Sequence, residues 1–296
     1  MRLLMRGIGA VAAAALGIVA CSSSPHSSAP PASAPSTTAT ATAGTATTAV
    51  PLTTTAAPAA TMDVRVYFMR GDKLDVAHRA VAPTQQVATA AMQALLAGPT
   101  ADEAAAGLGT AVPTGTRLLG ISIAGGGATV DLTGAFAGGG GSLSMMARLA
   151  QVTFTLTQFP TVERVAFHLD GKPVTAFGGE GIMLDHPATR ATFESVAPAI
   201  LVESPARGSA VQSPLRITGS ANVFEAQFQA ELAGPDGAVI AHQAVHATSG
   251  TGTRGTFDVT IPFTASGTAT LRVFDLSPKD GARTDIVEVP LQLVAS

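Results

Sequence analysis

Two histidines four residues apart, His242 and His246, have the spacing of a metal-binding pair. On a helix this spacing places both imidazoles on one face, and a glutamate directly after the first would complete a zinc protease motif. Here Gln243 follows His242 and cannot act as a general base, and the surrounding alternation predicts a strand. Residues four apart on a strand are separated by ~13 Å, which is too far for one ion. We interpret both residues as surface histidines.

A second group, Asp72, Asp75 and His78, has the residue types of an acid–base site but no nucleophile placed with it. A polar hairpin is the preferred interpretation. The glycine clusters at 138–141 and 178–181 lack the Gly-Lys-Ser/Thr ending of a phosphate-binding loop. The Gly-x-Ser-x-Gly elbow of many serine hydrolases is also missing from the sequence. The chain is therefore predicted not to be an enzyme, and to use no cofactor and no metal.

Cys21 is the single cysteine of the chain and stands at the end of an apolar run. Arg2 and Arg6 precede an uncharged stretch that is too short to span ~30 Å of hydrocarbon but has the length of a signal-peptide core. Ile18-Val19-Ala20-Cys21 resembles a bacterial lipobox, in which the thiol is acylated before cleavage. The resemblance implies that 1–20 is a lipoprotein signal peptide and that lipidated Cys21 begins the mature chain. A plain secretory signal with an incidental cysteine is the alternative.

A lipid on Cys21 would hold the protein at the extracytoplasmic side of the cell membrane. Each buried methylene contributes ~0.8 kcal/mol, and a diacylglyceryl group supplies two chains, so anchoring needs no membrane-spanning helix. With Cys21 used as the anchor, we expect no disulfide and no cysteine-based metal site. The formal net charge is -3 without a strong basic patch, which argues against a nucleic-acid partner.

The segment 21–61 consists almost wholly of Ser, Thr, Ala and Pro, and it contains no Lys, Arg, Asp or Glu. Such a composition cannot bury enough apolar surface to offset the entropy of ordering. Proline favours an extended chain, which would reach on the order of 120 Å at ~3.1 Å per residue. We predict a disordered stalk that holds the following domains away from the membrane. Stalks of this composition are either O-glycosylated or unmodified, and both alternatives stay open.

Residues 62–177 are predicted to form a small α+β domain. The expected order is a strand at 64–68, a weaker strand at 74–81, a helix capped by Thr84, a short helix after the capping box Thr100 to Glu103, a hairpin over 119–132, a helix over 142–159 and a strand over 165–169. Two helices on one face of a mostly antiparallel sheet would bury these apolar faces. The glycine run at 138–141 is expected to be a mobile connector.

Several short motifs in this domain resemble one family. They are Leu95-Leu96-Ala97-Gly98-Pro99-Thr100, Glu103, Gly107-Leu108, Pro113, Gly115-Thr116, Val130-Asp131-Leu132, Phe136, Ala150-Gln151 and Thr155-Leu156-Thr157-Gln158-Phe159-Pro160. In this order they are similar to the GerMN domain of bacterial spore-germination and sporulation lipoproteins, over most of 62–177. The resemblance implies a compact module without known catalytic residues that acts by protein–protein contact in the cell envelope.

The region 178–197 has no clear period and is predicted to be a linker, and 198–296 is predicted to be an all-β domain. Seven strand-like runs lie at 200–204, 215–220, 225–232, 238–248, 256–263, 268–275 and 284–294. In the third run Phe228, Ala230 and Leu232 are expected to face the core, and Glu231 to face outward. Seven alternating strands at this spacing favour an immunoglobulin-like sandwich.

This second half also resembles a known family. The residues concerned are Glu203-Ser204-Pro205, Gly219-Ser220-Ala221-Asn222-Val223-Phe224-Glu225-Ala226, Ser249-Gly250 with Arg254-Gly255, Pro262-Phe263 and Ser277-Pro278-Lys279-Asp280-Gly281. They are similar to the immunoglobulin-like domain of bacterial spore germination (Gmad2), which often accompanies GerMN. Pro278 departs from the small residue expected there, and this change should alter only the turn.

Asn222, Phe224, Glu225 and Arg254 could form a recognition patch, although such residues before a strand also serve turn geometry and packing. Together, these features favour a lipid-anchored, non-catalytic envelope protein that binds a protein or cell-wall partner. An envelope hydrolase would need a paired acid and base, which the sequence does not offer. A solute-binding lipoprotein would need two α/β lobes with a hinge. The process and the partner's identity lie beyond the sequence.

Overall fold

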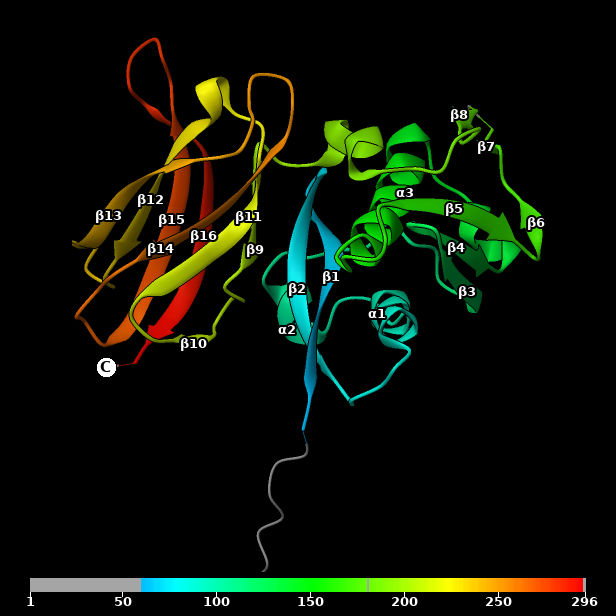
Figure 1. Cartoon of the computed structure of the whole chain (residues 1–296), viewed down its shortest axis with the longest axis horizontal. Helices are drawn as coiled ribbons and strands as arrows, with labels where there is room; N and C mark the ends of the chain where they lie inside the picture. The colour runs from blue at the N-terminus through cyan, green and yellow to red at the C-terminus, as the bar shows by residue number, and fades with distance from the viewer. Residues whose placement is uncertain (1–59, 180, 295–296) are drawn as a thin grey trace, which may run out of the picture. The chain divides into compact units, whose positions relative to one another are not determined.

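The computed structural model describes residues 60–179 and 181–294 (Figure 1). The predicted signal peptide 1–20, Cys21 and the predicted stalk up to residue 59 lie outside these described residues. Within the described ranges, no helix has both the length and the apolar character that crossing a membrane would require.

The first domain begins with a hairpin. β1 (Met62–Arg70) pairs antiparallel with β2 (Lys73–Val81) around a turn at Gly71-Asp72. Four consecutive residues of β1, Val66 to Met69, are buried. Because neighbouring side chains on a strand point to opposite faces, this run means that β1 is covered on both sides. The hairpin is a two-stranded sheet of its own.

The helices of the first domain are α1 (Val87–Leu96), α2 (Ala101–Ala105), the 3-10 helix η1 (Gly134–Ala137) and α3 (Ser142–Leu156). The predicted capping box is confirmed, because Thr100 Oγ1 accepts from Glu103 N at 3.3 Å and Glu103 Oε2 accepts from Thr100 N at 2.8 Å. The predicted cap at Thr84 is wrong. Gln86 is the N-cap of α1, and the Thr84 hydroxyl accepts a hydrogen bond from Gln86 N instead.

A second sheet of the first domain has the order β3-β4-β5-β6. Its strands are β3 (Leu118–Ala124), β4 (Gly127–Leu132), β5 (Arg164–Leu169) and β6 (Lys172–Pro173). The predicted hairpin is β3 with β4, but β4 and β5 are parallel. The sheet is therefore mostly antiparallel, as expected, and its one parallel pair arises because α3 carries the chain back along the sheet, as a crossover helix does between parallel strands.

The stretch predicted to be a linker contributes to the core of the first domain. It contains β8 (Ile182–Met183), which pairs with β7 (Ala176–Phe177), and the 3-10 helix η2 (Arg190–Val196). Phe193 of η2 is fully buried in the core that also holds Phe154 and Leu149 of α3. The connection between the domains is thus packed along much of its length.

The second domain is a two-sheet β-structure, as the sequence predicts (Figure 1). One sheet has the order β14-β11-β9, and the other has the order β10-β16-β15-β12-β13. The strands are β9 (Ile200–Ser204), β10 (Ala210–Val211), β11 (Leu215–Ala221), β12 (Gln227–Ala233), β13 (Val239–His246), β14 (Gly255–Ile261), β15 (Gly267–Leu276) and β16 (Arg283–Leu293), with η3 (Phe224–Ala226) before β12. Phe228, Ala230 and Leu232 are buried between the sheets, as expected from their alternation.

Candidate functional site

The two domains share a buried carboxylate, that of Glu203 on β9. Both domains belong to one unit of the chain, residues 57–296. Glu203 Oε1 accepts hydrogen bonds from the Tyr67 hydroxyl at 2.5 Å and from Arg190 Nη1 at 2.6 Å. Its Oε2 accepts from Arg65 Nη1 at 3.0 Å. We call Arg65, Tyr67, Arg190 and Glu203 the Glu203 cluster. It joins β1, η2 and β9, so it connects the first domain, the connecting segment and the second domain.

Local structure explains why these groups converge. Arg65 and Tyr67 are two apart on β1 and therefore share one face of the strand. The Gln158 side chain holds that part of β1 in place, because its Oε1 accepts from Arg65 N at 2.8 Å and its Nε2 donates to Arg65 O at 2.6 Å. The pair of bonds imitates a neighbouring strand. Arg190 is the first residue of η2, in the segment that connects the two domains.

Arg190 is held by aromatic as well as charged groups. Its guanidinium lies 4.8 Å from the centroid of the Phe154 ring and 5.4 Å from that of Tyr67. Nε donates to Thr157 Oγ1 at 2.9 Å, and Nη2 donates to the Tyr67 hydroxyl oxygen at 3.1 Å. Cation–π contacts of this kind strengthen when the cation is shielded from water. Each of the three guanidinium nitrogens thus donates to a group within the protein.

Burial alone would disfavour the charged form of Glu203. The charges of Arg190 and Arg65 and the Tyr67 hydrogen bond outweigh that effect and hold the pKa of Glu203 below its ordinary value. For Tyr67, burial is the main cause of a raised pKa, and the neighbouring Glu203 charge adds to it against the opposing effect of Arg190. The cluster therefore holds an ionised carboxylate and a neutral phenol, and neither is poised to exchange a proton near neutral pH.

The structure separates the group Asp72, Asp75 and His78. Asp75 Oδ2 accepts from Arg70 Nε at 2.6 Å, whereas His78 Nδ1 lies 2.6 Å from Asp63 Oδ2. His78 Nε2 lies 2.9 Å from the backbone oxygen of Glu203. Both neighbours of the imidazole are acceptors, so both bonds form together only when the ring carries two protons. His78 thus adds a further link between β2 and β9.

Two residues of the predicted recognition patch meet at a second carboxylate, that of Glu194 on η2. Arg254 Nε donates to Glu194 Oε2 at 2.9 Å, and Arg254 Nη2 donates to Glu194 Oε1 at 3.0 Å. Asn222 Nδ2 also donates to Glu194 Oε1, at 2.9 Å. Arg254 Nη2 reaches the backbone oxygen of Pro198 as well, at 2.5 Å. Asn222 and Arg254 are therefore engaged in holding η2 against the second domain.

The other two patch residues lie on the surface. Phe224 and Glu225 belong to η3, and the Phe224 side chain is 56% exposed. Glu225 has a φ of 52°, and its backbone N–H donates to Thr251 Oγ1 at 3.0 Å. The four predicted residues thus divide into a partly buried pair and an exposed pair. His242 and His246, interpreted as surface residues, are both exposed on β13.

A cleft of about 570 Å³ lies beside these clusters. Its charged lining residues are Arg190, Glu194 and Arg254, which are paired with one another or with Glu203, and the exposed Glu163, which lies 3.7 Å from Arg164. Among the described residues there is no group of three or more His, Cys, Asp or Glu side chains able to hold a metal ion. The cleft has room for a polar ligand, but three of its four charged lining residues, Arg190, Glu194 and Arg254, are engaged in joining the domains.

Glu203 was named from the sequence only as part of a family motif, and the other residues of the Glu203 cluster were not singled out. Arg65 and Tyr67 lie in an expected strand, and Arg190 and Glu194 lie in the expected linker. Phe193 and Val196 were a sequence signal that this segment is packed, because a solvated linker rarely contains large apolar side chains. Both are buried, and they set the position of the charged residues on either side of them.

Comparison with known sequences matches two families to separate parts of the chain. Residues 65–175 match Germane, described as sporulation and spore germination. Residues 199–282 match Gmad2, the immunoglobulin-like domain of bacterial spore germination. Arg190 and Glu194 lie between the two matched regions. No curated protein matches the chain significantly.

Solved structures with some likeness to the chain include a candidate lipoprotein from Clostridium perfringens, at 20% identity, with a TM-score of 0.34, covering 46% of this chain and 93% of that one. The tandem GerMN domains of the sporulation protein GerM from Bacillus subtilis match at 14% identity and a TM-score of 0.39, covering 62% of this chain and 59% of theirs. The assignment rests on the two sequence families. The chain carries a GerMN (Germane) domain of the sporulation and spore germination family, followed by a Gmad2 immunoglobulin-like domain.

Proposed function

We propose that this protein is a lipid-anchored, non-catalytic component of the bacterial cell envelope that binds a protein or cell-wall partner. Lipidated Cys21 attaches it to the extracytoplasmic side of the membrane, and the segment 21–61 spaces the domains from the bilayer. The GerMN and Gmad2 domains supply the binding surfaces. Both domains match families described by sporulation or spore germination, which supports this proposal.

The observation that carries this proposal is the Glu203 cluster. Its charged groups are saturated by one another, so they serve to hold two domains together rather than to transform a substrate. The pKa directions agree with this role, because a catalytic acid or base is usually shifted toward the working pH. Two domains held in a fixed relation present a partner with a preformed surface, which lowers the entropy cost of binding.

The anchor is tested by Cys21→Ser. Because serine cannot take the thioether-linked lipid, we expect the variant to leave the membrane fraction and appear in the soluble or secreted fraction. Membrane fractionation with immunoblotting measures this, and mass spectrometry of the mature amino terminus locates the cleavage. Ser22→Ala is the matched control and should behave as wild type. Retention of the Cys21→Ser variant in membranes, or of residues 1–20 in the mature protein, would contradict the proposal.

The interaction role is tested in intact cells. Chemical crosslinking of the wild-type protein, followed by purification and mass spectrometry, should recover the same envelope protein or wall fragment in independent cultures. The Cys21→Ser variant should lose that product, since it no longer resides at the membrane surface. A failure to recover any reproducible product through either domain would remove the support for an interaction role.

A further inference from the structure

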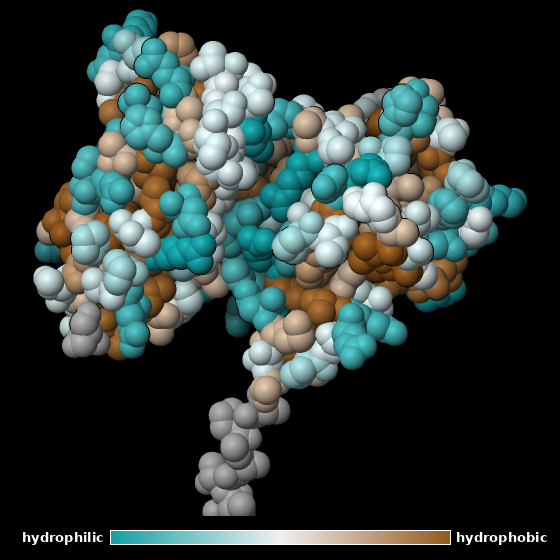
Figure 2. Space-filling model, in the orientation of Figure 1, coloured by the Kyte–Doolittle hydropathy of each residue, from teal (hydrophilic) through white to brown (hydrophobic). Residues whose placement is uncertain are grey.

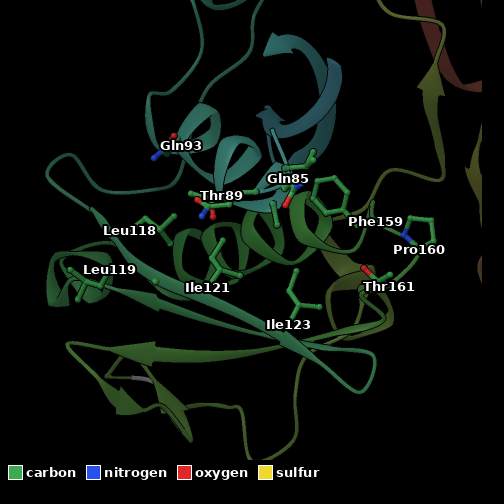
Figure 3. A pocket seen from close by; sticks show the side chains of 14 residues that line it. Gln85, Thr89, Gln93, Leu118, Leu119, Ile121, Ile123, Phe159, Pro160 and Thr161 are labelled. Atoms are coloured by element: carbon green, nitrogen blue, oxygen red, sulfur yellow. The ribbon is translucent and has the colours of Figure 1, made fainter. Parts of the chain in front are cut away.

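A groove of about 700 Å³, lined by both apolar and uncharged polar side chains, runs along the first domain between α1 and the edge strand β3 (Figure 3). None of the residues that line it is charged. Its apolar part is formed mainly by Leu118, Ile121, Ile123 and Phe159, and its polar groups are amides and hydroxyls, among them Gln85, Gln93 and Thr89. Hydrophobic residues also gather near α1 in the space-filling view (Figure 2).

The strand that forms one wall of the groove is at the edge of its sheet. β3 pairs with β4, and the sheet order places no further described strand on its other side. Beyond a bulge between Leu118 and Gly120, the residues from Gly120 to Ala124 pair in regular register. On such an edge, alternate backbone N–H and C=O groups point outward and form a template for another strand.

Proteins usually protect an edge of this kind with charges, proline or a covering element. β3 has neither a charged residue nor a proline over Leu118–Ala124. Ile121 lies opposite Val130 and Ile123 lies opposite Ala128, and both of those β4 residues are buried. Ile123 is nevertheless 42% exposed. The sheet face that α1 and α3 cover elsewhere is therefore incompletely covered along its β3 edge.

A strand added beside β3 would complete this cover. Its alternate side chains would fall on the same sheet face as Ile121 and Ile123, which point toward the side where Thr89 and Phe159 lie (Figure 3). They would fill the groove in front of α1. Because the lining carries no charge, a charged side chain placed there would lose water without gaining a partner.

We infer that the β3 edge and the α1 groove bind an extended, uncharged peptide segment of an envelope protein by strand addition, with apolar side chains at alternate positions. Main-chain hydrogen bonds to β3 supply affinity in this mode, and the groove selects the alternate side chains. The inference rests on the proposed interaction function and names the surface and the chemistry of the partner.

The test uses the full chain, purified in detergent, and three fluorescently labelled synthetic peptides with blocked ends. The first alternates valine and threonine, and the second carries proline at its central positions. The third has glutamate in place of each valine. We expect the first peptide to bind by fluorescence anisotropy. The proline and glutamate peptides should bind at least about tenfold more weakly. The proline peptide loses strand hydrogen bonds, and the glutamate peptide places charge in the groove.

Ile123→Glu should weaken binding of the valine–threonine peptide by at least about tenfold, because it places a carboxylate in the groove. Leu143→Glu is the matched control, since Leu143 is 57% exposed and does not line the groove, and it should bind as wild type. Circular dichroism checks that both variants fold. A third variant, Ile123→Val, keeps the groove apolar and should retain binding.

The inference is overturned if the valine–threonine peptide does not bind, if Ile123→Glu binds it as well as wild type, or if the proline peptide binds equally. Concentration-dependent self-association that Ile123→Glu abolishes would assign the edge to a second copy of the chain instead. If crosslinking in cells still captures a partner of the Ile123→Glu variant, the proposed interaction function is retained and only the assignment of the binding surface to the groove is rejected.

Discussion

Replacing Glu203 by alanine is expected to lower the free energy of unfolding by about 3–5 kcal/mol, the usual effect of removing one partner from a buried ion pair. The change leaves the guanidiniums of Arg65 and Arg190 facing each other without their shared carboxylate, and it removes the acceptor of the Tyr67 hydroxyl. Thermal unfolding followed by circular dichroism measures the loss. Limited proteolysis should also show earlier cleavage in the connecting segment.

Asp258→Ala is the matched control for this variant. Asp258 forms an ion pair with Arg216, but both side chains are more than half exposed. Exposed pairs contribute little because water and salt screen them. The control should therefore melt close to wild type. Equal melting temperatures for Glu203→Ala and wild type would show that the carboxylate does not hold the domains together.

The same carboxylate sets an expected pH dependence. The pKa of Glu203 is lower in the folded protein than its ordinary value of 4.5, so between the two values the unfolded chain binds the proton and the folded chain does not. The stabilisation is fully present above the ordinary pKa and is lost as pH falls through the folded value. As the pH is lowered below 4.5, wild type should therefore lose more stability than Glu203→Gln. If the stability of wild type and of Glu203→Gln fell equally with pH, Glu203 would not be the source of the pH dependence.

Replacing Arg148 by methionine is expected to cost about 1–3 kcal/mol, since it leaves the buried carbonyl oxygen of Phe136 unpaired. Arg148 is only 2% exposed, and its guanidinium donates to the backbone oxygens of Phe136 at 2.7 Å, Gly138 at 3.0 Å and Gly139 at 2.9 Å. It also donates to Ser144 Oγ at 3.0 Å. The glycine run expected to be a mobile connector is thus fastened to α3 by one side chain.

Hydrogen exchange distinguishes this effect from a general loss of packing. In Arg148→Met, the amides from Gly134 to Gly141 should exchange faster than in wild type, whereas the exchange rates of the β1 amides should change less. Arg148→Lys is the informative comparison, because an ammonium has three donors and lacks the planar fork that reaches several carbonyls at once. It should recover only part of the stability. Uniform acceleration across the domain, or no change in the glycine run, would contradict the fastening role.

The strands of the second domain were predictable because their signal is local. The alternation of apolar and polar residues around Phe228 and around Phe257 indicates directly which face of each strand is buried. Both residues pack in the core, with their ring centroids 5.0 Å apart. The capping box at Thr100 is equally local, since its two hydrogen bonds join residues three apart. In such elements the pattern and the packing require the same conformation.

The features that escaped prediction join residues far apart in the chain. Tyr67 and Glu203 are separated by 136 positions, and no periodicity records that they meet. Glu231 was expected to face outward on β12, yet it is 3% exposed, because Arg283 and Arg272 from neighbouring strands cover its carboxylate. The parallel pairing of β4 with β5 likewise depends on where α3 returns the chain. Pairing across the fold decides these details, and a single sequence does not state them.

The clamp that Gln158 places on both backbone groups of Arg65 has a mechanical consequence. If a bound partner pulls against an amino-terminal anchor, tension enters the described residues near Met62 and reaches Arg65 only three positions further along β1. There the backbone bonds to Gln158 and the side-chain bond to Glu203 would share the load, and Glu203 lies on the other domain. Force applied at the tether would thus first load the β1–β2 pairs from Met62 to Val64 and would then reach both domains together at Arg65.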